Sequence, residues 1–350
     1  MKHLFLIFIT IIISSCGTPR TGAKNEKTTI AEQTSSQVKK APLSEADYAK
    51  NISPEELKQL LYNLASDDFE GRKTGEAGQK KAAAFISGFY KKLGIEAANA
   101  DGDYLQHIPL DYFRGRSKDS SENVVAWIKG SSKPDEYVIF SAHYDHLGMD
   151  GKETYNGADD DGSGTVAVME IARAFKKAAD NGKGPERSVV FLHVTGEEIG
   201  LFGSRYYSEH PLFPLENTIA DLNIDMVGRV DEKYKDNPDF VYLIGSDKLS
   251  TELHEISEAT NKKYTQLTLD YTYNNENDPN RFYYRSDHYN FAKNGIPIIF
   301  YFNGTHEDYH QTTDTPDKIN YNVLAKRAQL VFLTGWELAN RDKRIAVDKK

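Results

Sequence analysis

The most informative segment of this sequence reads Tyr137-Val138-Ile139-Phe140-Ser141-Ala142-His143-Tyr144-Asp145. A short, mostly apolar run of this kind is typical of a buried β-strand, and here it leads directly into a histidine and an aspartate. The arrangement recurs at residues 188–194, where an apolar run precedes Glu197 and Glu198. Ligands of open α/β sheets bind at the carboxyl ends of the strands, so both segments predict a binding site at a sheet edge.

The pattern continues along most of the chain. Asp225 lies at the end of an apolar run and His310 a few residues beyond another. Alternation of buried strands with helices predicts a single three-layer α/β domain, with a mostly parallel mixed sheet covered by helices on both faces. The expected strands are residues 124–128, 137–142, 188–194, 219–226, 240–244 and 296–302, and the expected helices are residues 77–93, 165–178, 248–259 and 323–338. Residues 260–290, rich in Tyr, Asn and Asp, predict a long loop or lid.

Composition narrows the class of protein. The chain has 350 residues, of which 39% are hydrophobic and 11% aromatic, and this excludes a disordered chain. Its formal net charge is −9 and it has no basic tract, so we expect no nucleic acid partner. Acidic residues gathered near histidines suit cations instead.

The N-terminus predicts export. Residues 1–15 combine a charged start with an apolar stretch that is too short to span a membrane, which is typical of a signal peptide. Cys16, the only cysteine, follows as in the bacterial lipoprotein box, and we expect it to carry the lipid. Gly17, which is not an aspartate, favours the outer membrane of a cell envelope. The alternative is an ordinary secretory signal with a coincidental cysteine. Residues 16–43 predict a flexible tether, 44–340 the folded domain and 341–350 a charged tail that frays.

Three segments have the residue types of a metal site. Side chains two apart on an extended chain point the same way, so Asp145 can support His143 as a ligand. The adjacent carboxylates of Asp159, Asp160 and Asp161 repel one another unless a cation neutralises them or water solvates them. The alternative for these three is an acidic turn that caps the next helix. Glu197 and Glu198 suit metal-assisted hydrolysis, with one as ligand and one as base, or else they cap a helix.

Taken together, these segments resemble a known family. The order of the motifs is similar to that of the co-catalytic di-zinc aminopeptidases of metallopeptidase family 28, to which glutamate carboxypeptidases and glutaminyl cyclases are related. The resemblance covers about residues 53–340 and includes residues 69–72 and 286–288. The matching segments are His143-x-Asp145, Gly157-Ala158-Asp159-Asp160, Gly196-Glu197-Glu198-x-Gly200-Leu201-x-Gly203-Ser204, Asp225-Met226 and His310-Gln311-Thr312-Thr313-Asp314-Thr315.

The resemblance implies the zinc-exopeptidase fold and a role for each matching residue. Two Zn²⁺ ions, or Co²⁺ or Mn²⁺ in their place, would share one bridging carboxylate and one bridging water. Glu197 would be the general base, and Asp145 would orient His143. The implied metal ligands are Asp160 as the bridge, His143 and Asp225 in one site, and Glu198 and His310 in the other.

The implied activity is that of an aminopeptidase acting on peptides with a free N-terminus, and three alternatives stay open. A glutaminyl cyclase would have a tryptophan before the last histidine, whereas Tyr309 stands there. A carboxypeptidase of the same fold would need a basic group for the substrate carboxylate, such as Arg281 or Arg285. A non-catalytic peptide-binding lipoprotein would usually have lost a ligand or the base.

Other residues are less decisive. Ser286-Asp287-His288 is expected near the site but not as a nucleophile triad, because adjacent residues rarely have that geometry. His193 lies within an apolar run and predicts a core histidine. The tyrosines 264, 271, 273, 283, 284 and 289 either line the substrate pocket or pack in the core and surface.

Overall fold

The four strands that precede the predicted ligands are parallel neighbours at the centre of one sheet. In the computed structural model, which describes residues 11–14 and 43–349, these strands follow the order β7-β4-β8-β11. Their carboxyl ends therefore lie along one sheet edge. The strands are β4 (Lys133–His143), β7 (Arg187–Val194), β8 (Thr218–Ile224) and β11 (Ile298–Phe302).

The remaining strands extend this sheet on both sides and make it mixed. β3 (Ser121–Ile128) runs antiparallel to β7, and β9 (Phe240–Ile244) runs antiparallel to β11. Short strands complete the edges, and a separate hairpin follows β4. These strands are β1 (Glu96–Ala97) and β2 (Leu105–Ile108) on β3, β10 (Thr268–Asp270) on β9, and β5 (Gly148–Asp150) with β6 (Glu153–Tyr155) in the hairpin. The predicted fold class is confirmed.

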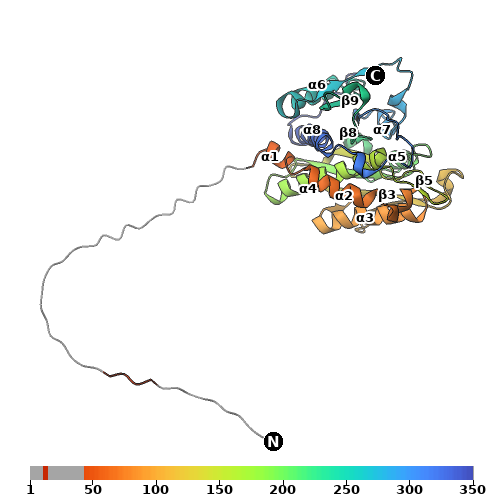
Figure 1. Ribbon diagram of the computed structural model, residues 1–350. Coiled ribbons are helices and arrows are strands. Elements are labelled where there is room, and N and C mark those ends of the chain that lie inside the picture. Colours follow the sequence, from red (N-terminus) through yellow and green to blue (C-terminus); the bar gives the residue numbers. More distant parts are fainter. Residues whose placement is uncertain (1–10, 15–42, 350) are drawn as a thin grey trace, which may run out of the picture. The chain divides into compact units, whose positions relative to one another are not determined.

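Helices cover both faces of the sheet, because alternate strand residues point to opposite sides. Within β4, Val138 and Phe140 join the larger core, whereas Ile139 joins the smaller one. Figure 1 shows α6 and β9 at one end of the folded unit and α3 with β3 at the other. The larger core packs under α1 (Glu45–Ala49), α2 (Pro54–Leu64), α3 (Ala77–Leu93), α4 (Gly164–Asp180), α6 (Thr251–Thr260) and α8 (Tyr321–Asn340), and the smaller core under α5 (Phe202–Glu209) and α7 (His288–Ala292).

Local sequence signals set several helix ends. The Ser53 side chain accepts the N–H of Glu56, and Pro54 occupies the first helical position of α2. α3 ends at Gly94, whose φ of 66° lies in the left-handed region that glycine adopts without steric cost.

Two boundary expectations need correction. Residues 260–290 are only partly a loop, because they contain β10, short helical turns and the start of α7. The C-terminal tail does not fray as expected: Ile345 is buried, and the Asp348 carboxylate accepts the N–H of Thr251 at the start of α6.

The folded unit comprises Leu43–Lys350, and Ser44 caps α1. The expected signal peptide, Cys16 and the tether lie outside the described residues, apart from residues 11–14. Among the helices that the structure describes, none has the length and apolarity required to cross a membrane.

Candidate active site

All five predicted metal ligands converge at the shared sheet edge. His143 ends β4, Asp225 follows β8, Glu198 follows β7 and His310 lies in the loop after β11. Asp160 lies between them, in the turn before α4. One of its carboxylate oxygens, Oδ1, is 3.2 Å from His143 Nε2, and the other, Oδ2, is 3.1 Å from His310 Nε2. The two carboxylate oxygens of Asp160 thus face two different histidines.

The remaining distances define two groups of donors. His143 Nε2 is 3.7 Å from Asp225 Oδ1, and His310 Nε2 is 3.2 Å from Glu198 Oε2. Two sets of side chains can each surround one ion with atoms within 4.8 Å of one another: His143, Asp161 and Asp225, and His146, Asp160 and Glu198.

The chemistry of these donors fits divalent metal ions. Imidazole nitrogens with carboxylate oxygens are ligands that zinc accepts. Asp160 Oδ2 is buried, and its 3.1 Å contact with His310 Nε2 lacks hydrogen-bond geometry, as expected of two atoms that would share a metal ion. Burial lowers the pKa of His310, but Asp160 and Glu198 outweigh it and raise this pKa to about 10. The carboxylates therefore attract positive charge strongly.

Glu197 lies beside these groups, and its surroundings raise its pKa. Burial, opposed by His143 and reinforced by Glu198, raises the pKa of its carboxyl group well above the usual value. The Glu197 N–H donates to Asp145 Oδ1 at 3.2 Å, and Thr74 donates to Asp145 Oδ2 at 2.7 Å. His143 Nδ1 contacts the backbone carbonyl of Asp145 at 3.1 Å, while the nearest carboxylate oxygen is 3.8 Å away. Asp145 thus supports His143 through its backbone and Glu197 through its carboxylate.

The Ser286-Asp287-His288 segment lies behind Asp225. Ser286 donates to Asp225 Oδ2 at 2.6 Å and so fixes one oxygen of that ligand. Asp287 is buried, neither of its carboxylate oxygens has a hydrogen bond within the part of the chain that the structure describes, and burial raises its pKa to about 7. His288 stacks on Phe300 and contacts the Tyr283 carbonyl, so it packs the wall.

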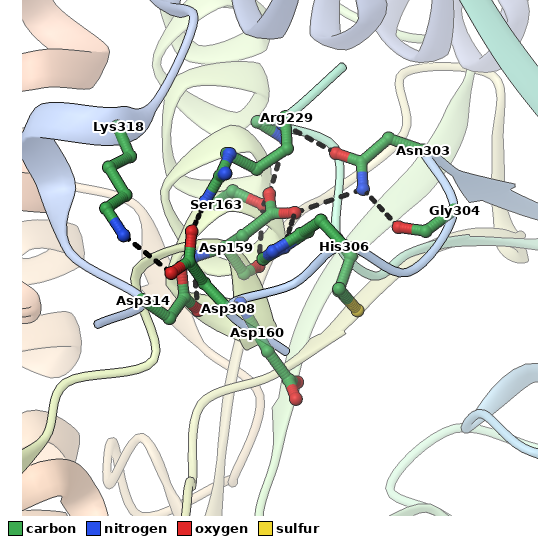
Figure 2. A network of polar contacts seen from close by, with 12 residues as sticks. Asp159, Asp160, Ser163, Arg229, Asn303, Gly304, His306, Asp308, Asp314 and Lys318 are labelled. Carbon is green, nitrogen blue, oxygen red and sulfur yellow. Dashed lines mark hydrogen bonds and ion pairs between the residues drawn. The ribbon is translucent and has the colours of Figure 1, made fainter. Parts of the chain in front are cut away.

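A network of buried polar side chains ties three ligand-bearing segments together (Figure 2). The Asp159 carboxylate accepts hydrogen bonds from the Gly228 N–H at 2.6 Å and from Asn303 at 3.0 Å, and it contacts His306 Nε2 at 3.1 Å. Asp314, four residues beyond His310, accepts the backbone N–H groups of Asp159 and Asp160. The turn with Asp160, the segment after Asp225 and the His310 loop are therefore held as one unit.

Arg72, from the motif at residues 69–72, is fully buried beneath the site. Its guanidinium donates to four backbone carbonyls in three segments, those of Leu64, of Tyr144, and of the adjacent Asn156 and Gly157. The segments that flank His143 and Asp160 are thereby fixed to η1 (Asp67–Arg72).

A pocket opens beside the ligands. Its metal side is formed by His143, Asp160, Glu197 and Asp225. The rest of the wall is mainly apolar, with Arg285 as its one basic side chain, and consists of Met226, Phe282, Arg285, Phe300, Phe302, Thr305 and Tyr309. None of the six tyrosines considered from the sequence is among these residues. His193 contacts the Tyr90 hydroxyl at 2.6 Å in the core, as predicted.

Sequence reasoning missed several site residues. His146 and Asp161 lie among the donor groups, although the sequence assigned neither of them as a metal ligand. The repeated histidine at 143 and 146 was a signal for His146. No local pattern marked His306 or Asn303, because the chain positions of these residues are far from Asp159.

Comparisons with known proteins agree with this geometry. A match to Peptidase family M28 covers residues 123–334. A "Probable zinc metalloprotease" of Pyricularia oryzae is 27% identical over 64% of this chain and 51% of its own length. "Aminopeptidase YwaD" of Bacillus subtilis is 26% identical over 74% of this chain and 53% of its own length. The chain thus spans about half the length of these relatives.

Solved structures share the fold. LapB from Legionella pneumophila superposes with a TM-score of 0.67 at 22% identity, over 84% of this chain and 74% of its own. A glutaminyl cyclase from Bacteroides thetaiotaomicron gives 0.62 at 18% identity, over 83% and 99%. The fold alone therefore does not separate a peptidase from a cyclase. The family match, together with the convergence of the ligands at the sheet edge, shows that the chain belongs to peptidase family M28.

Proposed function

We propose that this protein is a zinc-dependent aminopeptidase with two metal ions. The observation that carries the proposal is the placement of Asp160, whose two carboxylate oxygens face His143 and His310 on opposite sides. The partly exposed Glu197 lines the pocket beside this cluster. The names of the relatives support both the metal and the reaction.

The ligand residues divide between the two ions. His143 and Asp225 would hold one ion, and Glu198 and His310 the other, with Asp160 shared. Bound zinc supplies Lewis acidity, which acidifies water and polarises a peptide carbonyl. Cobalt or manganese would also suit this mixture of imidazole and carboxylate.

Glu197 is placed to move the proton during hydrolysis. Its raised pKa matches a group that accepts a proton from water and then delivers it to the leaving amine. Asp145 holds the backbone of Glu197, which fixes where the base sits. The surrounding carboxylates favour a cationic α-amine of the substrate, and the apolar wall suits the first side chain.

The function is tested with one set of matched peptides. A single sequence would be supplied with a free N-terminus, an acetylated N-terminus, an N-terminal Gln and an amidated C-terminus, and product masses followed. We expect stepwise N-terminal loss from the free and amidated forms, none from the acetylated form, and none after chelation. Loss of ammonia from the Gln peptide alone would instead identify a glutaminyl cyclase.

Arg285 favours one second candidate, a carboxypeptidase. Its guanidinium lies over the Phe282 ring at 5.0 Å and lines the pocket, where it could bind a substrate carboxylate. Arg281 stacks on Tyr284 instead and does not line this pocket. For this function, Arg285→Gln would abolish C-terminal loss, Arg281→Gln would not, and the amidated peptide would resist cleavage. N-terminal loss that survives both substitutions would exclude it.

We further propose that Cys16 carries a lipid that anchors the protein in the cell envelope, at the outer membrane. The support is the apolar stretch before a lone cysteine, followed by Gly17. Its peptide substrates would then come from the envelope or the surroundings of the cell.

A further inference from the structure

His146 is a buried histidine at the metal centre, outside the five ligands implied by the sequence. Its side chain follows His143 and Asp145 and is fully buried. Its Nδ1 lies 2.7 Å from Glu198 Oε1, which is hydrogen-bond distance. The distance from the same nitrogen to Asp160 Oδ2 is 3.8 Å. Among the potential ligands, His146 is therefore closest to Glu198.

The second ring nitrogen shows which hydrogen bond His146 makes. Nε2 is buried and has no hydrogen-bond partner among the described residues. A neutral imidazole carries one proton, and a buried N–H without an acceptor costs about 1–3 kcal/mol. The proton is therefore on Nδ1, where it meets the Glu198 carboxylate. A nitrogen that donates this proton is not available as a metal ligand.

The two oxygens of Glu198 then have separate tasks. Oε1 accepts from His146, whereas Oε2 lies 3.2 Å from His310 Nε2. His310 Nε2 in turn is 3.1 Å from Asp160 Oδ2, so Oε2 is the oxygen that faces the donors of the second ion. Holding one oxygen of a carboxylate fixes the direction of the other.

We propose that His146 is a positioning residue, which donates Nδ1–H to Glu198 Oε1 and thereby aims Oε2 at the second metal ion. The inference rests on the metal site of the proposed function, but not on peptide cleavage. At other metal sites, residues that do not bind the metal hydrogen-bond to a ligand and orient it. His146 would have this role for Glu198.

The backbone and a glycine fix the ring of His146. The backbone N–H of His146 donates to the Arg72 carbonyl at 3.3 Å. A side chain at Gly157 would come within 2.5 Å of the imidazole ring, so the ring fills the space above this glycine. The plane of the ring is therefore held by close packing, and the Glu198 carboxylate selects which edge of the ring carries Nδ1.

Two amide substitutions test the roles of the two ring nitrogens of His146 separately. The Asn side chain can place an N–H where Nδ1 of His146 lies, whereas the Gln amide reaches the position of Nε2. Zinc would be titrated into the metal-free full chain, in competition with a chelator, for wild type, His146→Asn, His146→Gln and His146→Ala. The exposed His107→Asn is the matched control.

We expect His146→Asn to keep the second-site zinc affinity within about threefold of wild type, as His107→Asn does. His146→Gln and His146→Ala would weaken that site about 10- to 100-fold and leave the other site unchanged. The amide pair is close to histidine in size, so the comparison stands even where the alanine variant folds poorly.

Two results would overturn the inference. Equal losses in all three variants, with a changed Co²⁺ absorption spectrum, would make His146 a direct ligand. Unchanged affinity in all three would remove any role at the metal. Zinc binding is read without substrate, so an inactive wild type would contradict the proposed function and leave this test intact.

Discussion

His310 lies between two carboxylates, and the proton it carries couples metal binding to pH. Its pKa of about 10 means that the metal-free protein holds a proton on His310 at neutral pH, which a metal ion must displace. Raising the pH makes this displacement easier. We therefore predict that second-site zinc affinity rises about tenfold per pH unit between pH 6 and 8.

The measurement is calorimetric titration of zinc in two buffers of different ionisation enthalpy, which reports the protons released. His310→Gln removes this proton and is the control, with weaker binding but a shallower pH dependence. Wild-type affinity that stays constant over the same range, without proton release, would refute this prediction.

At the residue scale, the sequence indicated which side chains gather at the site, but not which contacts they make with one another. The convergence of His143, Glu198 and Asp225 could be predicted because each lies at or beyond the end of an apolar run, and these runs end at the same sheet edge. The contact of the Asp145 carboxylate with the Glu197 backbone could not, because it depends on how two loops meet. The same holds for the cis peptide bond between Asp160 and Asp161, which a local pattern does not reveal.

At the scale of elements, Asp159 joins the turn before α4 to the segments after β8 and β11. Asparagine in its place keeps one acceptor oxygen where the carboxylate offers two, so buried donors lose their partner. We predict that Asp159→Asn lowers the free energy of unfolding by about 2 kcal/mol and weakens metal binding. Urea unfolding of the metal-free protein measures the first effect.

Asp317→Asn, at an exposed position beyond the His310 loop, is the matched control. It should change neither the free energy of unfolding nor the metal affinity. An Asp159→Asn protein with wild-type stability and wild-type metal affinity would show that the network in Figure 2 does not support the site.

Arg72 also connects elements, because its guanidinium donates to four backbone carbonyls from different parts of the chain. A lysine has a single ammonium group and cannot reach all four carbonyls that the planar guanidinium binds. We predict that Arg72→Lys lowers the free energy of unfolding by about 3 kcal/mol. Chemical denaturation would test this, with the exposed Arg114→Lys as control. A loss below 0.5 kcal/mol would contradict it.

The helices and strands that were predicted correctly are the longer ones with buried apolar residues. Residues 77–93 form the expected helix because the helical spacing of apolar residues continues over the whole segment and Gly94 ends it. β10, β1 and β2 were missed because strands of two to four residues have too little pattern. Their pairing comes from neighbouring strands rather than from their own sequence.

At the scale of the whole molecule, the proposed lipid anchor places the enzyme at a membrane through Cys16 alone. We predict that Cys16→Ser in the bacterial host removes the protein from the membrane fraction and abolishes labelling by a radioactive fatty acid. Ser15→Ala is the control and should leave both unchanged. A Cys16→Ser protein that stays lipid-labelled and membrane-bound would contradict the anchor.

The most direct test of the central claim compares wild type and Glu197→Gln for zinc content and for release of the first residue from one peptide with a free N-terminus. Glutamine keeps the size of Glu197 but cannot accept the proton. We predict equal zinc content in the two proteins and a 10²- to 10⁴-fold slower release by the variant. A variant that retains its metal and cleaves within tenfold of wild type would contradict the role of Glu197 and the mechanism built on it.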